Sequence, residues 1–247
     1  SVSSNKVGIL LQSIKDGTSE AQYFHLFGDP AMLLPMPKDT LISAFISPDT
    51  LKTLEIGTYS GVQDLINGSG DGYVSLVDAD VDIIREYEIL SETYSLSYTL
   101  PGATLFRGQF SFSGSSINGQ IRIPEDISYS TKPAKLLLYI NDNQTEARAV
   151  ISTIHLAGGE TTEDIFGPQI SFETINGTKL ELNDHLTENE QLIVRLSDPL
   201  GINLTNETGH EIIITNLNSS DASTATDKFY YDQNSITTGK INFSIDD

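Results

Sequence analysis

The side chains best suited to hold a metal ion lie between residues 67 and 78, which read Asn-Gly-Ser-Gly-Asp-Gly-Tyr-Val-Ser-Leu-Val-Asp. Asn67, Ser69 and Asp71 present oxygen atoms at alternate positions, a glycine follows at the sixth position, and Asp78 stands at the twelfth. This spacing resembles that of a calcium loop. However, two of the usual acids are replaced by neutral residues, and the flanking residues are typical of strands rather than helices. A Gly-rich hairpin turn is the alternative interpretation.

A second acidic group follows directly, with carboxylates at Asp78, Asp80 and Asp82. In a strand, alternate residues point to the same side, so these three side chains would share one face. Such a face could attract a cation, but charged residues of this kind usually form a solvated surface. We interpret this group as solvated surface and keep calcium as the one cofactor candidate.

The residue types needed for hydrolysis are not arranged in a recognisable site. The chain has no cysteine, which rules out a thiol nucleophile and thiolate metal ligands within it. None of the four histidines has a partner at the spacing of a zinc site, and no serine lies in a Gly-x-Ser-x-Gly turn. We therefore predict no catalytic residue in this chain. The histidines are His25, His155, His185 and His210.

The composition restricts the classes of partner. The 247 residues carry a net charge of −20, from 34 acidic and 14 basic side chains. Binding to nucleic acid or to an anionic membrane surface needs clustered Lys and Arg, so the charge argues against both. No apolar run approaches the roughly 20 residues of a membrane helix, so we expect no membrane insertion.

The first residues differ in pattern from the rest of the chain. Apolar residues at 7, 10, 11 and 14 form one helical stripe, which predicts a helix from Asn5 to Lys15. Tyr23 to Phe27 reads as a short buried strand. One helix and one strand cannot cover their own apolar faces, so we interpret residues 1–37 as the tail of an α/β domain whose body lies upstream. Pro35 and Pro37 end this part.

After Pro37 the pattern predicts strands separated by turn residues at intervals of roughly 8–12 residues, as in a sandwich or barrel. Residues 38–158 are accordingly predicted to form one all-β module. Its predicted strands are Leu41–Ile46, Thr53–Tyr59, Gly72–Val77, Ile84–Ile89, Tyr94–Thr99, Gln109–Phe112, Gln120–Ile123, Lys135–Ile140 and Ala147–Ile154.

A linker beginning at Gly158 leads to a second set of strands. Residues 159–247 hold fewer strands than the usual seven of an immunoglobulin-like sandwich, so we expect an incomplete module with an open edge. The fold predicted for the whole chain is mostly β, with two sandwich modules after the α/β tail. The strands predicted for the second module are Gln169–Glu173, Gln191–Leu196, Glu211–Leu217, Phe229–Tyr231 and Lys240–Ile245.

Five motifs, in this order along the chain, together resemble the C-terminal part of gingipain-like cysteine peptidases, most of all the PorU-type sortases of type IX secretion. The first resembles the stretch that closes the caspase-like catalytic domain of that family, and the others resemble parts of the β modules that follow it. The motifs are YFHLFGDPAMLLPMP, GDGYVSLVDADV, LFRGQFSFSGSSINGQIRIPEDISY, IFGPQISFETING and LSDPLGINLTNETGHEIIITN.

This resemblance implies a non-catalytic region of a peptidase or sortase at the bacterial outer-membrane surface or outside the cell. The catalytic Cys and His of the family lie upstream of the first motif, so no catalytic residue is carried over to this chain. The β modules would brace the upstream peptidase domain of the same protein and offer a docking surface to secreted cargo or surface proteins. Gly209-His210-Glu211-Ile212 departs from the family pattern Gly-His-Asp-Ile.

Two other classes of function remain open at this stage. The predicted open edge would suit a surface adhesin or filament subunit that assembles by strand addition. A carbohydrate-binding module needs exposed aromatic side chains, and the chain has no Trp and one adjacent pair of tyrosines, Tyr230-Tyr231. We therefore rank the carbohydrate-binding interpretation last.

Overall fold

A computed structural model gives the fold of the chain. It describes residues 7, 9, 11, 12, 31, 32, 37, 39–142, 144–159, 166–186, 191–215 and 222–244. The chain divides into two compact units, Ser1–Asp39 and Thr40–Asp247. Both predicted β modules therefore lie within the second unit.

Little of the first unit is described. Val7, Ile9, Leu11 and Gln12 have helical backbone, within the helix predicted for Asn5 to Lys15. The predicted strand from Tyr23 to Phe27, His25 and the Gly28-Asp29-Pro30 turn lie outside the described residues. Among the described residues, no helix is long and apolar enough to cross a membrane.

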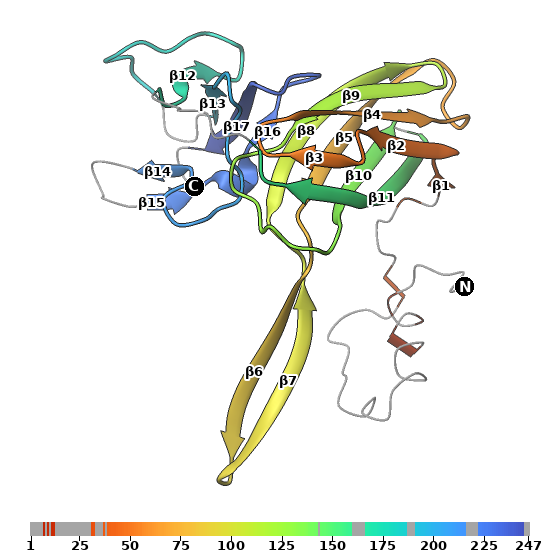
Figure 1. Cartoon of the computed structure of the whole chain (residues 1–247). Coiled ribbons are helices and arrows are strands. Elements are labelled where there is room, and N and C mark those ends of the chain that lie inside the picture. The colour runs from red at the N-terminus through yellow and green to blue at the C-terminus, as the bar shows by residue number, and fades with distance from the viewer. Residues whose placement is uncertain are drawn as a thin grey trace. The chain divides into compact units, whose positions relative to one another are not determined.

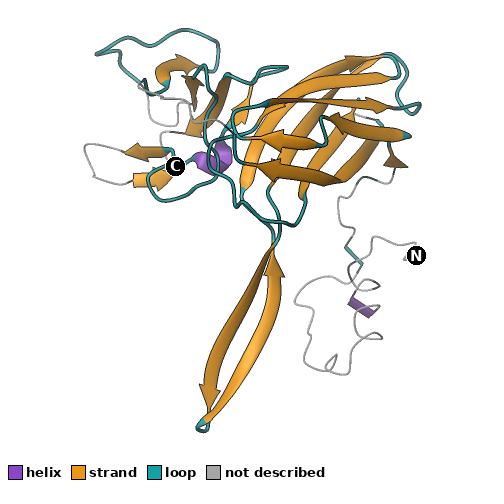
Figure 2. Cartoon of the chain, viewed as in Figure 1, coloured by secondary structure: helices purple, strands orange, loops and turns teal. Residues whose placement is uncertain are grey.

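The described part of the second unit is almost entirely β structure, as predicted (Figure 2). Its one described helix is a short 3₁₀ turn, η2 (Thr226–Lys228). The strands of the first module are β1 (Asp39–Thr40), β2 (Ser43–Ser47), β3 (Thr50–Lys52), β4 (Ile56–Val62), β5 (Ser69–Val77), β6 (Val81–Ile89), β7 (Glu92–Leu100), β8 (Thr104–Ser113), β9 (Ser116–Arg122), β10 (Ala134–Asn141) and β11 (Glu146–Ala157). Those of the second are β12 (Gln169–Thr174), β13 (Gln191–Ser197), β14 (Ile213–Thr215), β15 (Ala222–Thr224), β16 (Tyr230–Tyr231) and β17 (Thr238–Ser244).

The first module has two facing layers (Figure 1). One layer has the strand order β11-β10-β5-β8, and the other has the order β9-β4-β2. The chain passes between the layers at the β8–β9 hairpin, where Ser113 pairs with Ser116. Tyr59 of β4 meets Phe110 of β8 edge to face, with 5.6 Å between the ring centres. The alternation of buried and exposed residues along β5, β8 and β10 follows from this arrangement, because one face of the layer packs on the core and the other faces water.

The second module continues the same sheet. Its strands follow β8 in the order β16-β17-β13-β12, with β14 and β15 as a separate short pair. The crossing is a single parallel pairing of Tyr231 with Gly108. Buried residues from both modules, from Leu41 to Ile241, form one apolar cluster. The two modules therefore share a core.

The glycines of the 67–78 stretch have a packing role. Gly70 and Gly72 lie on the inward face of β5, opposite Phe112 and Phe110 of β8. A Cβ atom at Gly72 would lie 2.2 Å from the Phe110 ring, and one at Gly70 would lie 2.6 Å from the Phe112 ring. The rings thus cover the two glycines, a known means of filling the space that a strand glycine leaves.

We predict that Gly72→Val destabilises the protein by about 1–3 kcal/mol, because the added side chain forces the buried Phe110 ring to move. Urea unfolding monitored by circular dichroism measures this change. Gly167→Ala is the matched control: nothing lies within 4 Å of its added Cβ, and the backbone is not left-handed. Equal unfolding midpoints for the two variants would contradict the packing role.

Candidate functional site

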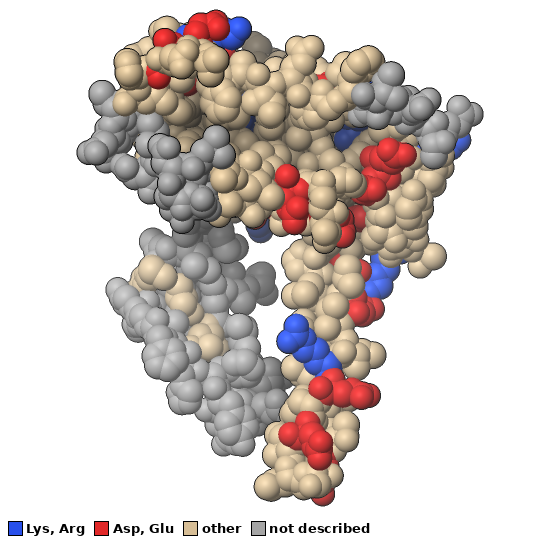
Figure 3. All heavy atoms as spheres, turned by 90° about the vertical axis from the view of Figure 1, so that its left-hand side faces the viewer, with Lys and Arg blue, Asp and Glu red and all other residues tan. Residues whose placement is uncertain are grey.

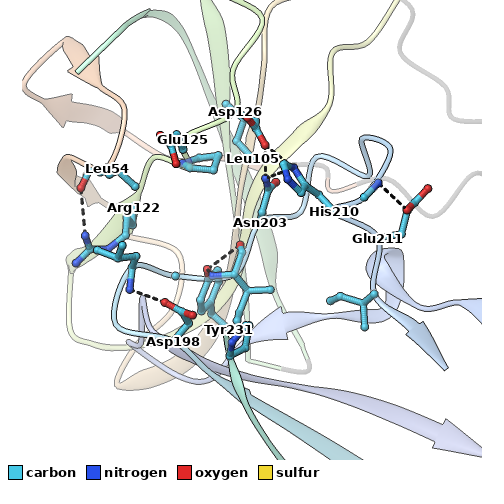
Figure 4. Close-up of a pocket in the computed structure, with 17 residues that line it drawn as sticks. Leu54, Leu105, Arg122, Glu125, Asp126, Asp198, Asn203, His210, Glu211 and Tyr231 are labelled. Atoms are coloured by element: carbon cyan, nitrogen blue, oxygen red, sulfur yellow. Dashed lines mark hydrogen bonds and ion pairs between the residues drawn. The ribbon is translucent and has the colours of Figure 1, made fainter. Parts of the chain in front are cut away.

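The junction between the two β modules is built around the buried Tyr231 (Figure 4). Its side-chain hydroxyl donates a hydrogen bond to the Ile202 carbonyl at 3.0 Å and accepts one from the Ile202 amide at 2.5 Å. Both polar groups of one backbone position are thereby satisfied in the interior, where an unpaired group would be costly. Burial raises the pKa of Tyr231 above its ordinary value, so the hydroxyl keeps the proton that it donates.

Aromatic rings hold Tyr231 from two sides. The ring of Phe106, from the first module, stacks on it at 4.5 Å with 9° between the planes. Phe229 meets it edge to face at 5.1 Å. Gly108 gives Tyr231 room, because a Cβ there would lie 2.9 Å from the Phe106 ring and 3.3 Å from the Tyr231 Cβ. Such ring pairs add about 0.5–1.5 kcal/mol each beyond the burial of apolar area.

A tight turn at Asp198-Pro199-Leu200-Gly201 forms the next part of the junction. The buried Asp198 carboxylate accepts a hydrogen bond from the Leu200 amide at 2.7 Å, and Gly201 adopts a left-handed φ of 90°. The Arg122 side chain of the first module passes beside Gly201, where a Cβ would lie 3.3 Å from its Cδ. Its guanidinium donates to the Leu54 carbonyl at 3.1 Å.

A polar cluster completes the junction. Asp126 of the first module accepts a hydrogen bond from the Asn203 side-chain amide at 2.7 Å and pairs with the His210 ring at 2.5 Å. Asn203 and His210 belong to the second module, and their side chains lie 3.0 Å apart. Figure 4 shows the three side chains converging on one point. They tie two loops together across the junction.

Between these groups lies a cavity of about 410 Å³. Arg122, Asp126, Asp198 and His210 line it together with apolar residues from both modules. A His–carboxylate pair is one part of a hydrolytic triad, but none of the described residues lining this cavity is a Ser, Thr or Cys. Sequence reasoning did not find this cluster, because its members lie far apart along the chain.

The second candidate surface is the long β6–β7 hairpin, called the ribbon here, which projects from the body of its unit (Figure 1). The pairing of β6 with β7 places directly opposed residues on the same side. One side carries mostly apolar pairs, and the other carries mostly polar ones. The apolar-side pairs are Val81–Leu100, Ile83–Tyr98, Arg85–Leu96, Tyr87–Tyr94 and Ile89–Glu92; the polar-side pairs are Asp82–Thr99, Ile84–Ser97, Glu86–Ser95 and Glu88–Thr93.

The apolar side of the ribbon is open to solvent. Leu96 is 52% exposed, and Leu90 at the tip is 96% exposed. The rings of Tyr87 and Tyr94 stack at 5.8 Å. Asp and Glu side chains are scattered along the surface of the ribbon (Figure 3). An apolar strip with polar surroundings is typical of a protein-binding surface.

The structure separates the four calcium candidates. Ser69 and Asp71 lie at the start of β5 and Asn67 lies just before it, whereas Asp78 follows its end. Asp71 and Asp78 are seven residues apart along an extended strand, or roughly 23 Å. Asp78 is buried, and its two carboxylate oxygens accept hydrogen bonds from the Ala79 amide at 2.6 Å and the Ser128 amide at 2.7 Å. Among the described residues, no group of three or more His, Cys, Asp or Glu side chains could hold a metal ion.

The other residues singled out in the sequence have local roles. Asp80 pairs with Lys135, and Asp82 pairs with Lys132. The hydrogen bond from Lys132, with one from Thr99, lowers the pKa of Asp82. These two acids therefore form partly exposed ion pairs. His155 is exposed on β11, and His185 is exposed in a loop of the second module.

Comparisons with known proteins give a distant likeness. No family model matches the chain, and no curated protein matches it. Among solved structures, it is similar to dimeric latent PorU from Porphyromonas gingivalis, with 19% identity and a TM-score of 0.47 over 98% of this chain and 25% of that one. It is also similar to the sporulation control protein Spo0M from Bacillus subtilis, with 8% identity and a TM-score of 0.27 over 83% and 89%. The chain thus spans about a quarter of the length of PorU. Values this low assign no function.

We predict that alkaline pH destabilises the protein through its buried tyrosines. Burial raises the pKa of both Tyr231 and Tyr59 in the folded state, whereas in the unfolded chain these hydroxyls ionise near pH 10. The stabilisation is fully present below about pH 10 and is lost at higher pH, by about 1.4 kcal/mol per pH unit for each tyrosine. Tyr231→Phe should remove one such contribution to the slope.

Urea unfolding at several pH values between about 9 and 11.5 measures this slope. Tyr231→Phe also loses the two bonds to Ile202, so it should be less stable at neutral pH by about 1–3 kcal/mol. Tyr129→Phe, at an exposed position, is the control and should match the parent chain. An unchanged slope in Tyr231→Phe would show that this hydroxyl ionises in the folded protein.

Proposed function

We propose that this chain is the non-catalytic β region of a gingipain-like cysteine peptidase or sortase of the type IX secretion kind. In this role it braces the upstream peptidase domain of the same protein and offers a docking surface for proteins. The proposal places it outside the cell or on the bacterial outer-membrane surface. The catalytic Cys and His would lie in the upstream domain.

One structural observation supports the resemblance of the sequence motifs. Three of the five motifs, separated by long stretches of chain, meet at the module junction. Leu105 and Arg122 come from the third motif, Pro168 comes from the fourth, and Gly201 and Ile202 come from the fifth; all line one cavity. Motif residues that converge at one place are expected if the motifs preserve the packing of two modules against each other.

The junction suits a bracing role. Tyr231 is fixed by two rings and two hydrogen bonds, and Asp126 ties the neighbouring loops together. The Arg107 guanidinium reaches from β8 to the carbonyls of Asp227 and Phe229. A shared core and these cross-links resist hinge motion between the modules, because bending would break buried contacts that water cannot replace. A stiff pair of modules can hold an attached domain in place.

The ribbon provides the docking surface. An isolated two-stranded hairpin is marginally stable in water, and its edges are unpaired. Its apolar side would gain from being covered, since roughly 25 cal/mol is released for each Å² of apolar surface removed from water. Arg85 is the cation within that side, so a matching surface would be apolar with an acidic group near its centre. We assign this surface to the upstream domain first, and to cargo second.

We predict that backbone amides of the ribbon exchange hydrogen at least about tenfold more slowly in the complete natural protein than in the 247-residue chain. The physical reason is burial of the apolar side against another domain. Hydrogen–deuterium exchange mass spectrometry compares the two samples. β10 serves as the internal reference, because it lies in the core of the sheet and should exchange equally in both.

Paired variants test which side of the ribbon docks. In the complete protein, Leu96→Asp should restore fast exchange, since Leu96 lies on the apolar side opposite Arg85. Ser97→Asp is the matched control, since Ser97 lies on the polar side opposite Ile84. Equally fast exchange of the ribbon in the chain and in the complete protein would refute the docking role.

A second candidate function is a surface adhesin or filament subunit that assembles through an open sheet edge. Within the described residues, β12 pairs with β13 along one edge. At the other edge, residues 178–180 bond to Phe172 and Thr174, and no strand pairs with residues 169–171. Ile170 and Phe172 of β12 are 61% and 45% exposed, although they lie on the same face as the buried Val194 and Leu196 of β13. A donated strand would extend the sheet at this edge and cover them.

Under this second function, the 247-residue chain self-associates at concentrations up to about 100 μM, as sedimentation velocity would show. Phe172→Glu should abolish the association, because it places a charge on the apolar face at the open edge. Ser171→Glu, on the opposite face of the same strand, should leave it intact. A chain that stays monomeric over this range would eliminate the assembly hypothesis and leave the bracing proposal unaffected.

A further inference from the structure

A polar groove with an aromatic wall lies on the outer face of the sheet where the two modules meet. Its volume is about 510 Å³, within the range of about 300–1,000 Å³ that is usual for ligand sites. Residues of β5 and β8 form one side, and residues of the second module form the other. The lining residues are Asp71, Gly72, Tyr73, Gln109, Phe110, Arg195, Asp232, Gln233 and Lys240.

The aromatic wall is Tyr73 of β5, and Tyr139 on the neighbouring strand stands behind it, outside the groove lining. Tyr73 of β5 stands directly opposite Tyr139 of β10, with 6.2 Å between the ring centres. The Tyr139 hydroxyl donates a hydrogen bond to Glu146 at 2.9 Å, which fixes that ring in place. Tyr73 is 47% exposed, so part of its ring is open to a ligand. Among the described residues, its hydroxyl has no hydrogen-bond partner.

Planar polar groups line the rest of the groove. The Gln233 amide donates to Asp71 at 3.3 Å, which ties the two modules together over the groove. Arg195 donates to Asp232 at 2.9 Å and to Glu173 at 2.8 Å. Gln109 of β8 stands directly beside Tyr73, and its side-chain amide makes no hydrogen bond within the described part of the chain. It can therefore donate and accept at once.

We propose that this groove binds a saccharide chain, with one sugar ring stacked on Tyr73 and its hydroxyls bonded to Gln109, Asp71 and Gln233. A pyranose ring has one face of C–H groups, which packs on the electron-rich face of an aromatic ring. Its hydroxyls each donate and accept hydrogen bonds, which matches amide and carboxylate side chains rather than a cluster of one charge. An open groove that crosses strands suits a chain of sugars.

The structure favours a saccharide over a peptide in this groove. The floor is formed by β5 and β8, whose backbone groups already pair with each other and with β10. A peptide therefore cannot add as a strand here, as it can at an open edge. The carboxylates of the lining, together with the net charge of −20, disfavour phosphate-rich ligands. The sequence ranked carbohydrate binding last because the chain has no Trp and one Tyr-Tyr pair, and it gave no sign that Tyr73 would stand beside Tyr139.

Titration of the isotope-labelled 247-residue chain by nuclear magnetic resonance tests the proposal. The probes are cellohexaose, mannohexaose, chitohexaose and maltohexaose at up to about 10 mM, a concentration that would nearly saturate a site with a dissociation constant of about 1 mM. We expect at least one probe to shift the resonances of Tyr73 and Gln109. Tyr73→Ala should weaken that binding at least about tenfold, and Tyr73→Phe should retain it because the ring face remains.

Tyr129→Ala removes an exposed tyrosine outside the groove and is the matched control, which should bind as the parent does. If none of the four probes shifts Tyr73, or if binding survives Tyr73→Ala, the proposal is overturned. Shifts confined to Arg195 and Asp232 on addition of a charged peptide, lost in salt, would indicate a peptide ligand and also overturn it. Neither result depends on whether the chain belongs to a peptidase.

Discussion

The packing of Tyr231 between Phe106 and Phe229, with its hydroxyl bonded to both backbone groups of Ile202, is the contact on which the arrangement of the β modules depends. It joins two sheets into one through the pairing of Tyr231 with Gly108. The hydroxyl of this buried tyrosine both donates and accepts a hydrogen bond. A shift of the ring would leave a buried polar group unpaired, so the position of the side chain is tightly fixed. The outer face of the joined sheet, and therefore the groove beside Tyr73, exists because this contact fixes the modules.

The ribbon differs from the body in how much of its apolar surface is buried. The body buries large aromatic and aliphatic side chains, whereas the β6–β7 pair shares almost nothing with the core and leaves its apolar side in water. Exposing apolar surface to water is unfavourable in free energy unless a partner covers it. The opposite side of the hairpin is polar and acidic, which favours contact with water. Two kinds of surface thus coexist in one unit: a body whose large apolar side chains are mostly buried, and an amphipathic arm whose apolar side is exposed.

The 67–78 stretch shows why a motif can mislead. Its alternation of oxygen-bearing residues and glycines resembled a calcium loop, yet the same alternation is that of a strand. The glycines face inward, where Phe110 and Phe112 cover them, and the polar residues face outward. Asp78, at the far end, is held by two backbone amides. Spacing along the sequence does not distinguish a closed loop from an extended strand. A closed loop brings these side chains close together, whereas an extended strand holds its two ends roughly 20 Å apart.

The β class, most strand positions and the acidic character of the chain can be predicted from the sequence. Alternation, turn residues and charge are local properties, so each segment shows them without its neighbours in space. The sequence also shows the motifs whose residues line the junction, but it does not predict that these motifs lie next to one another in space. The pairing of Asp126 with His210, the free-standing ribbon and the contact of Gln233 with Asp71 beside Tyr73 appear in the folded chain alone. Those facts depend on the order and register of strands far apart in the chain, and register is set by long-range packing, which no single segment encodes.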